Sequence, residues 1–445
     1  CCNSREDEKM LNLKLFRSIQ SRSKLNDILF EFKICQPISR FLSQNNNSSF
    51  AEFELFPEDL SAEQAYYYNE TNQQQILNNI KSREIEDSFP ELFDRNLSIE
   101  ELGNRLVKLS KRLPNTFHPI WNQRKPEIYV SEIVGEKRDF DFEAKQAEEI
   151  LYEKKLLQLS GKNNGKLGTV GGSRSYMMFG RLATLSKALS RWTLNVLIDR
   201  FKFVPVVTPN LVYSNFVRAC GFEPYGARTQ VYNLQTRNNV CLPGTAEILL
   251  AAMNTGEKFN HDELPKLYCG LSRCYRAEAK SRGEKSGLYR IHYFDKVEMF
   301  GLSKADKSDD LLEEFVEIQK FLFSSLGLHY RVIDMPPNEL GLPAYRKYDI
   351  EAFMPGRNIW GEISSASNCT DFQSSKLNIS YHEFSVESKN SDEKIDLKRN
   401  FVHTVNGTAC AIPRMLIALI EQGQTENQLI QIPKVLQPYI NFESI

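Results

Sequence analysis

Arginine, aromatic and carboxylate side chains recur at every second position in one segment of the sequence, residues 274–300. Period-two spacing predicts β-strands, and the polar loop 280–287 between two such stretches predicts a hairpin. We expect the first strand to carry Arg276 and Glu278 on one face. We expect one face of the second strand to carry Arg290, His292, Phe294, Lys296 and Glu298. Arginines bind phosphates in a forked geometry, a ring stacks on a base, and a carboxylate holds an amine. The hairpin therefore suits an anionic, purine-bearing ligand, although a strand pair with one solvated face would show the same pattern.

A hydroxyl and a carboxylate lie two residues apart at the expected start of a helix. Thr245 and Glu247 follow Pro243 and Gly244 and precede an apolar run. Thr245 could act only as a helix cap, with Glu247 favourably placed in the first turn. The same two groups would also suit the ammonium or hydroxyl group of an amino acid, and the pattern leaves both interpretations open.

Two later segments suit a phosphate-bearing ligand. Glu362 precedes a dense run of hydroxyl side chains that includes Ser364 and Ser365. Such oxygen ligands are typical of Mg²⁺ bridging phosphates, although a plain polar loop is an alternative. Arg414 follows Pro413, which fits the first turn of a helix. The buried stripe of that helix is expected to comprise Leu416, Ile417 and Ile420. An arginine there is costly unless it meets an anion, so this helix start predicts a phosphate site.

The composition limits the class of protein. A chain of 445 residues is long enough for two or three domains. The formal net charge of −1 argues neither for nor against a nucleic-acid partner. The nine cysteines form no C-x-x-C motif, which favours reduced, mostly buried thiols over a zinc site. No apolar run approaches the roughly 20 residues that span a bilayer, so we expect no membrane partner.

The N-terminal residues 10–48 have a composition of their own. They contain several lysines, arginines and serines, with few acidic residues and an amphipathic leucine pattern. This composition is typical of an organelle transit peptide, and the mitochondrion is the favoured destination. A disordered basic tail without a targeting role would have the same composition.

The remaining pattern predicts the elements that would position these residues. Residues 60–112 read as an antiparallel helical hairpin whose basic side chains could contact nucleic-acid phosphates, although a solvated helix pair is the simpler interpretation. Further helices are expected over 141–160, over 179–200 and from Ser308 to Gly327. Strands are expected over 203–207 and 329–334. Long helices with several antiparallel strands indicate an α+β domain.

Taken together, the motifs resemble those of the class II aminoacyl-tRNA synthetases. The Arg-x-Glu hairpin resembles motif 2 of that class, NGTACAIPR (406–414) resembles motif 3, and residues 203–212 resemble motif 1. Within the class, TAE (245–247), EISSASNCTDFQ (362–373) and the helical hairpin before LPNTFHP resemble seryl-tRNA synthetases. The segments LGLPAYRKYDIEAFMPGR and NGTACAIPR are most similar to the animal mitochondrial enzymes. The resemblance covers roughly residues 60 to 440.

The resemblance implies a role for each matching residue. Serine binding is implied for Thr245, Ala246, Glu247, Arg276, Glu298, Asn406 and Thr408. ATP binding is implied for Arg276, Ala277, Glu278, Arg290, Ile291, Phe294, Glu362, Ile363, Ser364, Ser365 and Arg414. Of these, Arg276, Glu362 and Arg414 would be catalytic, and Glu362 with Ser365 would bind the Mg²⁺ carried by ATP. Arg276 would contact the α-phosphate and the serine carboxylate, and Arg414 the γ-phosphate.

The resemblance also implies an architecture. It is an α+β fold, a class II antiparallel sheet flanked by helices, with an N-terminal antiparallel helical-hairpin arm. Residues 1–48 would form the disordered N-terminus with a transit peptide, 49–160 the tRNA-binding arm and linker, and 161–445 the catalytic domain. The chain would pair as a homodimer, or as a heterodimer with a paralogue.

The implied activity is that of a serine–tRNA ligase. It would activate L-serine with ATP to seryl-adenylate and transfer serine to the 3′ end of tRNA(Ser), in the mitochondrial matrix and for mitochondrial translation. The alternative is a catalytically silent synthetase-like subunit paired with an active synthetase. The chain retains Arg276, Glu278, Glu298, Glu362 and Arg414, which favours the enzyme. The chain departs from the family's pattern at Tyr293, where glutamine is usual, and at the pair Ser374-Ser375, where a basic pair is usual.

Overall fold

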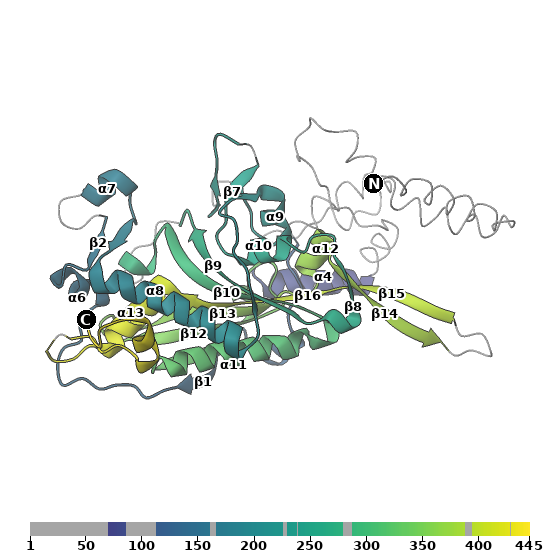
Figure 1. Cartoon of the computed structure of the whole chain (residues 1–445). Helices are drawn as coiled ribbons and strands as arrows, with labels where there is room; N and C mark the ends of the chain where they lie inside the picture. The colour runs from purple at the N-terminus through teal and green to yellow at the C-terminus, as the bar shows by residue number, and fades with distance from the viewer. Residues whose placement is uncertain are drawn as a thin grey trace, which may run out of the picture. The chain divides into compact units, whose positions relative to one another are not determined.

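The computed structural model of the chain is organised around one eight-stranded sheet (Figure 1). The structure describes residues 70–85, 113–160, 166–225, 229–237, 239–278, 287–387, 394–427 and 429–445. In spatial order the strands are β1 (Tyr129–Val134), β11 (Tyr330–Asp334), β12 (Arg346–Met354), β13 (Ile359–Asn368), β16 (His403–Ala411), β10 (Tyr293–Ser303), β9 (Lys266–Tyr275) and β4 (Val204–Pro205). Neighbouring strands are antiparallel except β4 and β9, which pair in parallel at one edge.

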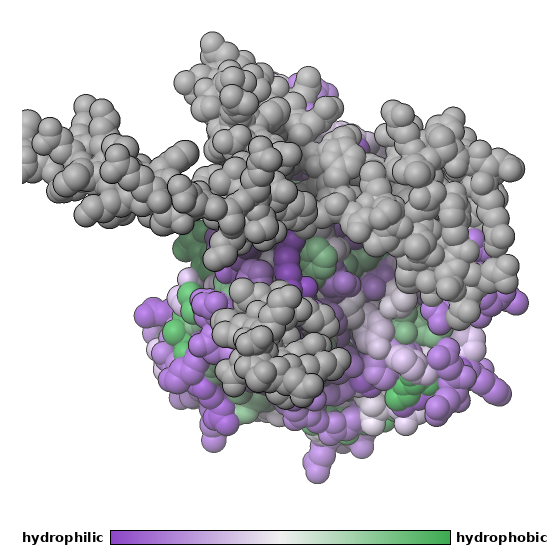
Figure 2. All heavy atoms as spheres, turned by 90° about the vertical axis from the view of Figure 1, so that its right-hand side faces the viewer, coloured by the Kyte–Doolittle hydropathy of each residue, from purple (hydrophilic) through white to green (hydrophobic). Residues whose placement is uncertain are grey.

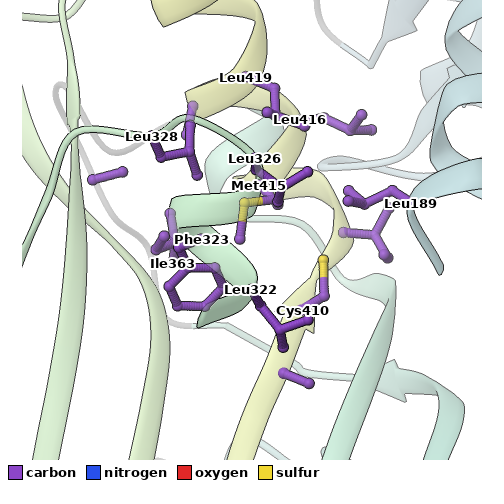
Figure 3. Close-up of a cluster of buried hydrophobic side chains, with 14 of the residues drawn as sticks. Leu189, Leu322, Phe323, Leu326, Leu328, Ile363, Cys410, Met415, Leu416 and Leu419 are labelled. Atoms are coloured by element: carbon purple, nitrogen blue, oxygen red, sulfur yellow. The ribbon is translucent and has the colours of Figure 1, made fainter. Parts of the chain in front are cut away.

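Three long helices cover one face of this sheet and form the main core. They are α8 (Gly180–Asn195), α11 (Ser308–Ser325) and α13 (Ile412–Gly423), and a π-helical turn (Val196–Arg200) follows α8. Figure 3 shows apolar side chains of all three helices converging with Ile363 of β13 and Cys410 of β16. Leu416, Ile417 and Ile420 are fully buried, which confirms the predicted stripe of the last helix.

Shorter elements lie over the opposite face of the sheet and leave room for a cavity. They comprise α9 (Ser214–Ala219), α10 (Glu247–Ala252), α12 (Phe372–Leu377), the small sheet β5 (Val212–Tyr213), β7 (Val240–Leu242) and β6 (Tyr232–Asn233), and the sheet β15 (Lys394–Phe401), β14 (Ser380–Glu387) and β8 (Lys258–Asn260). A second apolar cluster joins them to Phe300 and Leu302 of β10. The two faces of β10 therefore serve two different cores.

The remaining elements precede or connect these layers. They are α4 (Glu70–Ser82), α6 (Ala147–Glu153), β2 (Leu157–Leu159), α7 (Lys166–Gly171) and β3 (Tyr176–Met178), with 3-10 turns at Pro119–Gln123, His261–Glu263, Gly287–Tyr289, Ala305–Lys307, Pro337–Glu339 and Lys434–Tyr439. No helix in the described ranges is long and apolar enough to cross a membrane. On the face shown in Figure 2, hydrophilic residues make up most of the described surface and hydrophobic ones form small separate patches.

Several predicted elements are confirmed, and others differ in extent. The helices predicted over 179–200 and from Ser308, and the strand over 329–334, are present. Ser308 is not the cap, however: the N-cap position is Lys307, and the Ser308 hydroxyl donates to the Ala305 carbonyl at 3.3 Å. Only α6 of the helix predicted over 141–160 forms, because Lys155 takes a left-handed φ of 56° and the chain turns into β2.

The hairpin that carries the arginines is present but shorter than predicted. β9 ends at Tyr275 and β10 begins at Tyr293, so Arg276 and Glu278 follow the first strand, and Arg290 and His292 precede the second. Glu278 has a positive φ of 30°, which ends the extended backbone. The Arg276 amide still donates to the His292 carbonyl at 2.8 Å. Phe294, Lys296 and Glu298 share one face, as period-two spacing predicts. Loop residues 279–286, most of the predicted helical arm and the N-terminal 69 residues lie outside the described residues.

Candidate active site

Most of the predicted site residues line one cavity of about 300 Å³. Its lining includes Thr245, Glu247, Arg276, Glu278, Ile291, Phe294, Glu298, Glu362, Ile363, Ser364, Ser365, Asn406, Thr408 and Arg414. Three of the predicted residues do not line it: Ala246 is buried within the second core, Arg290 pairs with Glu278, and Ala277 lies beside the cavity residues in sequence only. A cavity of this volume can hold a small ligand.

One end of the cavity is built around a buried carboxylate, Glu298. The β10–β16 register places it opposite Thr408, and the Thr245 hydroxyl donates to it at 3.2 Å. Lys296 forms an ion pair with Glu298, and its ammonium also donates to the Thr245 hydroxyl at 2.9 Å and to the Thr408 hydroxyl at 3.4 Å. The side chains of Lys296 and Glu298 are only 7% and 2% exposed. This end therefore offers hydroxyl and charged groups whose partners are fixed in advance.

A second carboxylate, Glu247, lies at the same end, at the start of α10. Its amide donates to the Thr245 hydroxyl at 3.2 Å, and its carboxylate accepts from Gln373 at 2.6 Å and from Asn406 at 3.0 Å. Burial, together with the negative charge of Glu298, raises the pKa of Glu247 to about 7. Glu298 is paired with Lys296, whereas Glu247 accepts only from neutral amides, so this end suits a ligand that brings a positive charge.

The middle of the cavity presents an arginine over an aromatic ring. The Arg276 guanidinium lies 5.2 Å from the centre of the Phe294 ring, and its Nε donates to the Gly244 carbonyl at 3.4 Å. Glu278 accepts from Arg290 at 2.8 Å, which fixes the carboxylate beside the ring. A flat ring next to a guanidinium and a carboxylate matches the groups that a nucleotide requires.

The far end of the cavity carries an arginine at the N-terminus of α13. Arg414 pairs with Glu362 at 3.1 Å and lies 4.5 Å from the centre of the Tyr289 ring. Burial would raise the pKa of Glu362, but the positive charges of Arg414, Lys347 and Arg276 outweigh it and lower that pKa. The anion that a buried arginine needs is therefore present within the chain, and a phosphate would compete with it for Arg414.

A β-bulge decides which hydroxyl of the polar run faces the cavity. The register between β12 and β13 shifts next to Glu362, and Ile363 points into the main core. The Ser364 hydroxyl donates to the Thr408 carbonyl and accepts from Gln319 at 2.9 Å, so it is occupied within the sheet and helix layers. Ser365 and Glu362 both line the cavity. The plain polar loop, which was the alternative interpretation, is thus excluded, because the run lies on the central strand β13.

The cavity combines a polar, acidic end with an aromatic and cationic end, and known proteins of similar sequence indicate the family. A family model described as the tRNA synthetase class II core domain (G, H, P, S and T) matches residues 232–423. A mitochondrial serine–tRNA ligase of the mouse is 39% identical over 82% of this chain and 68% of its own length. A serine–tRNA ligase of Treponema denticola is 37% identical over 78% of this chain and 79% of its own length. The chain belongs to the class II seryl-tRNA synthetases, the serine–tRNA ligases.

The fold of this synthetase agrees with that of a solved relative. A seryl-tRNA synthetase of Pyrococcus horikoshii, determined as a complex with ATP, aligns with a TM-score of 0.68 and 29% identity over 87% of this chain and 91% of that one. The predicted α+β class II core with its large antiparallel sheet is thereby confirmed.

Sequence reasoning missed three residues that line the cavity, Lys296, Tyr289 and Lys347, and Gln373, which is buried behind Glu247. The spacing of Lys296 from Phe294 and Glu298 predicted that it shares their face of the strand, but the sequence indicated no role for it. Gln373 was part of the polar run, and the Thr404 hydroxyl donates to its carbonyl group at 2.8 Å, which directs its amide toward Glu247. No sequence signal indicated Tyr289 or Lys347, which line the cavity from a 3-10 turn and from β12.

The structure also accounts for the two departures from the family's pattern. Tyr293 points away from the cavity: its ring stacks on Tyr176 at 5.2 Å and its hydroxyl donates to the Tyr176 carbonyl at 3.0 Å. The Ser374 hydroxyl donates to the Val402 carbonyl within the interior. Both residues therefore have structural partners of their own.

Proposed function

We propose that this synthetase activates serine for mitochondrial translation, in the mitochondrial matrix. Mitochondrial relatives such as the mouse enzyme support this location, as does the transit-peptide composition of residues 10–48, although bacterial relatives are almost as similar. We assign residues 1–48 to targeting, 49–160 to the tRNA-binding arm and 161–445 to catalysis. Localising the protein with and without residues 10–48 tests the targeting role. Cytosolic staining of both forms would contradict it.

The acidic end of the cavity is the proposed serine subsite. Glu247 and Glu298 would hold the ammonium group, and Thr245, Asn406 and Thr408 would surround the serine hydroxyl. Alanine would lack the hydroxyl that makes further hydrogen bonds to these buried polar groups, and the extra methyl group of threonine would be excluded by size. This assignment depends on one observation: hydrogen bonds from neighbouring side chains hold the two buried carboxylates, Glu247 and Glu298, in place.

The remainder of the cavity is the proposed ATP subsite. Phe294 would stack on adenine with Glu278 beside it, Arg276 would contact the α-phosphate and the serine carboxylate, and Arg414 would contact the γ-phosphate. The ATP complex of the P. horikoshii relative supports ATP as the nucleotide.

Mg²⁺ fits the same subsite. Glu362 is kept ionised by neighbouring cations, and Ser365 lines the cavity with it. No group of three or more metal-binding side chains occurs among the described residues, which suits an ion that takes its other ligands from phosphates. Bound Mg²⁺ would supply positive charge to the phosphates, with Glu362 and Ser365 as its protein ligands.

The reaction depends more on the positioning of serine and ATP than on proton transfer by a side chain. The serine carboxylate is already ionised, so it attacks the α-phosphorus without a general base, and pyrophosphate leaves. Negative charge develops on the phosphate oxygens, and Arg276 and Arg414 are placed in advance to stabilise it. The acyl group of the seryl-adenylate then passes to the terminal ribose hydroxyl of tRNA(Ser), and AMP and the hydroxyl proton are released.

Serine-dependent ATP–pyrophosphate exchange on the purified protein tests this function. Exchange that requires serine, and that alanine and threonine do not support, is the expected result. A protein that shows no exchange above background, yet binds an active synthetase, would instead be the silent subunit of the alternative hypothesis.

The raised pKa of Glu247 predicts the pH dependence of serine use. A serine ammonium needs the ionised carboxylate, which loses its proton only as the pH rises through about 7. We therefore expect kcat/KM for serine to fall about tenfold per pH unit below pH 7 and to level off above it. In Glu247→Gln the plateau should be lower and the acid limb absent. A wild-type profile that is flat between pH 6 and pH 8 would contradict this role.

We also propose that the synthetase is a homodimer that pairs along the β4 edge of the sheet. Val204, Val207 and Leu211 are 54%, 98% and 47% exposed, which is unusual for neighbouring large aliphatic residues. Val207→Asp is expected to increase the monomer fraction in analytical ultracentrifugation, because a charge would be buried on pairing. Val170→Asp, at another exposed valine, is the matched control. Equal behaviour of the two variants would place the interface elsewhere, and a mixed dimer with a paralogue would appear as a second chain.

A further inference from the structure

An arginine near the N-terminus of the described chain is buried against the wall of the serine subsite. Arg83 follows the last turn of α4 and is 6% exposed. Its guanidinium donates to the carbonyls of Gly341 at 3.1 Å, Ala344 at 2.6 Å and Thr116 at 3.1 Å. Among the described residues no carboxylate pairs with it, and burial lowers its pKa to about 10. Apart from the Asn79 side-chain carbonyl, which accepts from its Nε at 3.3 Å, its partners are therefore backbone carbonyls.

Those backbone groups belong to a loop that lines the cavity. Gly341, Pro343 and Ala344 form part of the cavity wall. On its other side the loop is packed tightly, because a Cβ added at Gly221 would lie 2.8 Å from the Pro343 ring. The next residue, Phe222, also lines the cavity. The wall is thus held between α9 and the N-terminal segment.

A second residue of the N-terminal segment holds the same wall. The Asn115 amide donates to the Pro343 carbonyl at 2.8 Å and to the Cys369 carbonyl at 2.9 Å. Cys369 accepts from Asn406 at 3.5 Å, and Asn406 donates to Glu247. Asn79 of α4 donates to the Asn115 carbonyl at 3.0 Å, which joins the two contacts. A continuous set of hydrogen bonds therefore connects α4 with the serine subsite.

We propose that Arg83 and Asn115 are positioning residues for serine: they hold the 341–344 wall in place, so the N-terminal segment shapes the serine subsite even when no tRNA is bound. The inference depends on the proposed function, because it assigns that subsite to serine. A guanidinium fork reaches two carbonyls of the wall at once, which a lysine ammonium cannot match in geometry. The position of the wall should therefore depend on arginine itself and not on positive charge alone.

The test uses ATP–pyrophosphate exchange by the full chain without tRNA. In Arg83→Met and Asn115→Ala we expect KM for serine to rise about tenfold, while KM for ATP changes less than about twofold. In Arg83→Lys we expect a smaller rise in KM for serine. Lys81→Met is the matched control, since Lys81 is exposed on the same helix. Its serine KM should equal that of the wild type.

Two results would overturn the inference. An unchanged serine KM together with a higher KM for tRNA in aminoacylation would mean that Arg83 only anchors the arm. Equal losses toward serine and ATP, with a lower melting temperature, would mean a general structural role. Calorimetric binding of a seryl-sulfamoyl adenosine probe gives the same comparison without turnover. A wild-type protein that binds the probe but shows no pyrophosphate exchange would contradict the proposed function. The positioning role would then be tested by comparing the affinities of the wild type and the variants for the probe.

Discussion

Arg414→Ala is expected to reduce serine-dependent ATP–pyrophosphate exchange by about a thousandfold or more, because it removes the arginine that we propose contacts the departing pyrophosphate. In the structure the guanidinium is held by Glu362 at 3.1 Å and lies over the Tyr289 ring at 4.5 Å. These contacts fix its direction before ATP binds, so little reorganisation is needed during the reaction. The proposed dimer should remain intact, since α13 begins inside the chain's own core.

Two control variants distinguish the effect of the Arg414 guanidinium on activity from the effects of its neighbours and of its charge. Tyr289→Phe removes the hydroxyl that donates to the Glu362 carbonyl at 3.2 Å but keeps the ring, and should cost less than about fivefold. Arg414→Lys keeps the charge and loses the fork, and should recover only a small part of the activity. Loss of the dimer in Arg414→Ala, seen by ultracentrifugation, would show instead that the residue is structural.

The alternation from Phe294 to Glu298 could be predicted because a strand's period is a local property. The ends of that strand could not, because they depend on distant contacts: the Glu148 carboxylate, 140 residues before Leu288, accepts from its amide and holds the turn that precedes Arg290. Period-two reading therefore extended the hairpin too far on both sides.

The bulge beside Glu362 shows a second limit of sequence reasoning. A run of hydroxyls does not reveal which of its members face the cavity, because one extra residue in a strand reverses the alternation. Both Ser364 and Ser365 reach the cavity lining, but the Ser364 hydroxyl is already engaged by Gln319 and the Thr408 carbonyl. Arg83 shows the same limit over a longer range, since its carbonyl partner Gly341 lies 258 residues away. Type and spacing predicted the chemistry, whereas the tertiary contacts decided which side chains deliver it.

Lys296→Met is expected to lower kcat/KM for serine by about a hundredfold and to destabilise the fold by about 3 kcal/mol, because it leaves a buried carboxylate without its cation. Lys296 forms an ion pair with Glu298 and donates to the hydroxyls of Thr245 and Thr408. It thereby fixes three groups of the serine subsite at once. The loss should appear in KM for serine, while KM for ATP changes by less than about threefold.

A second lysine of the cavity, which is partly exposed, provides the matched control. Lys347 also lines the cavity, but it pairs with Asp349 at 2.8 Å and its charge lowers the pKa of Glu362. Lys347→Met should therefore raise KM for ATP more than KM for serine, the reverse of Lys296→Met. In urea unfolding, Lys296→Met with Glu298→Gln should recover part of the lost stability, because the double variant no longer buries an unpaired charge. If both lysine variants weaken serine and ATP equally, the division of the cavity into two subsites is wrong.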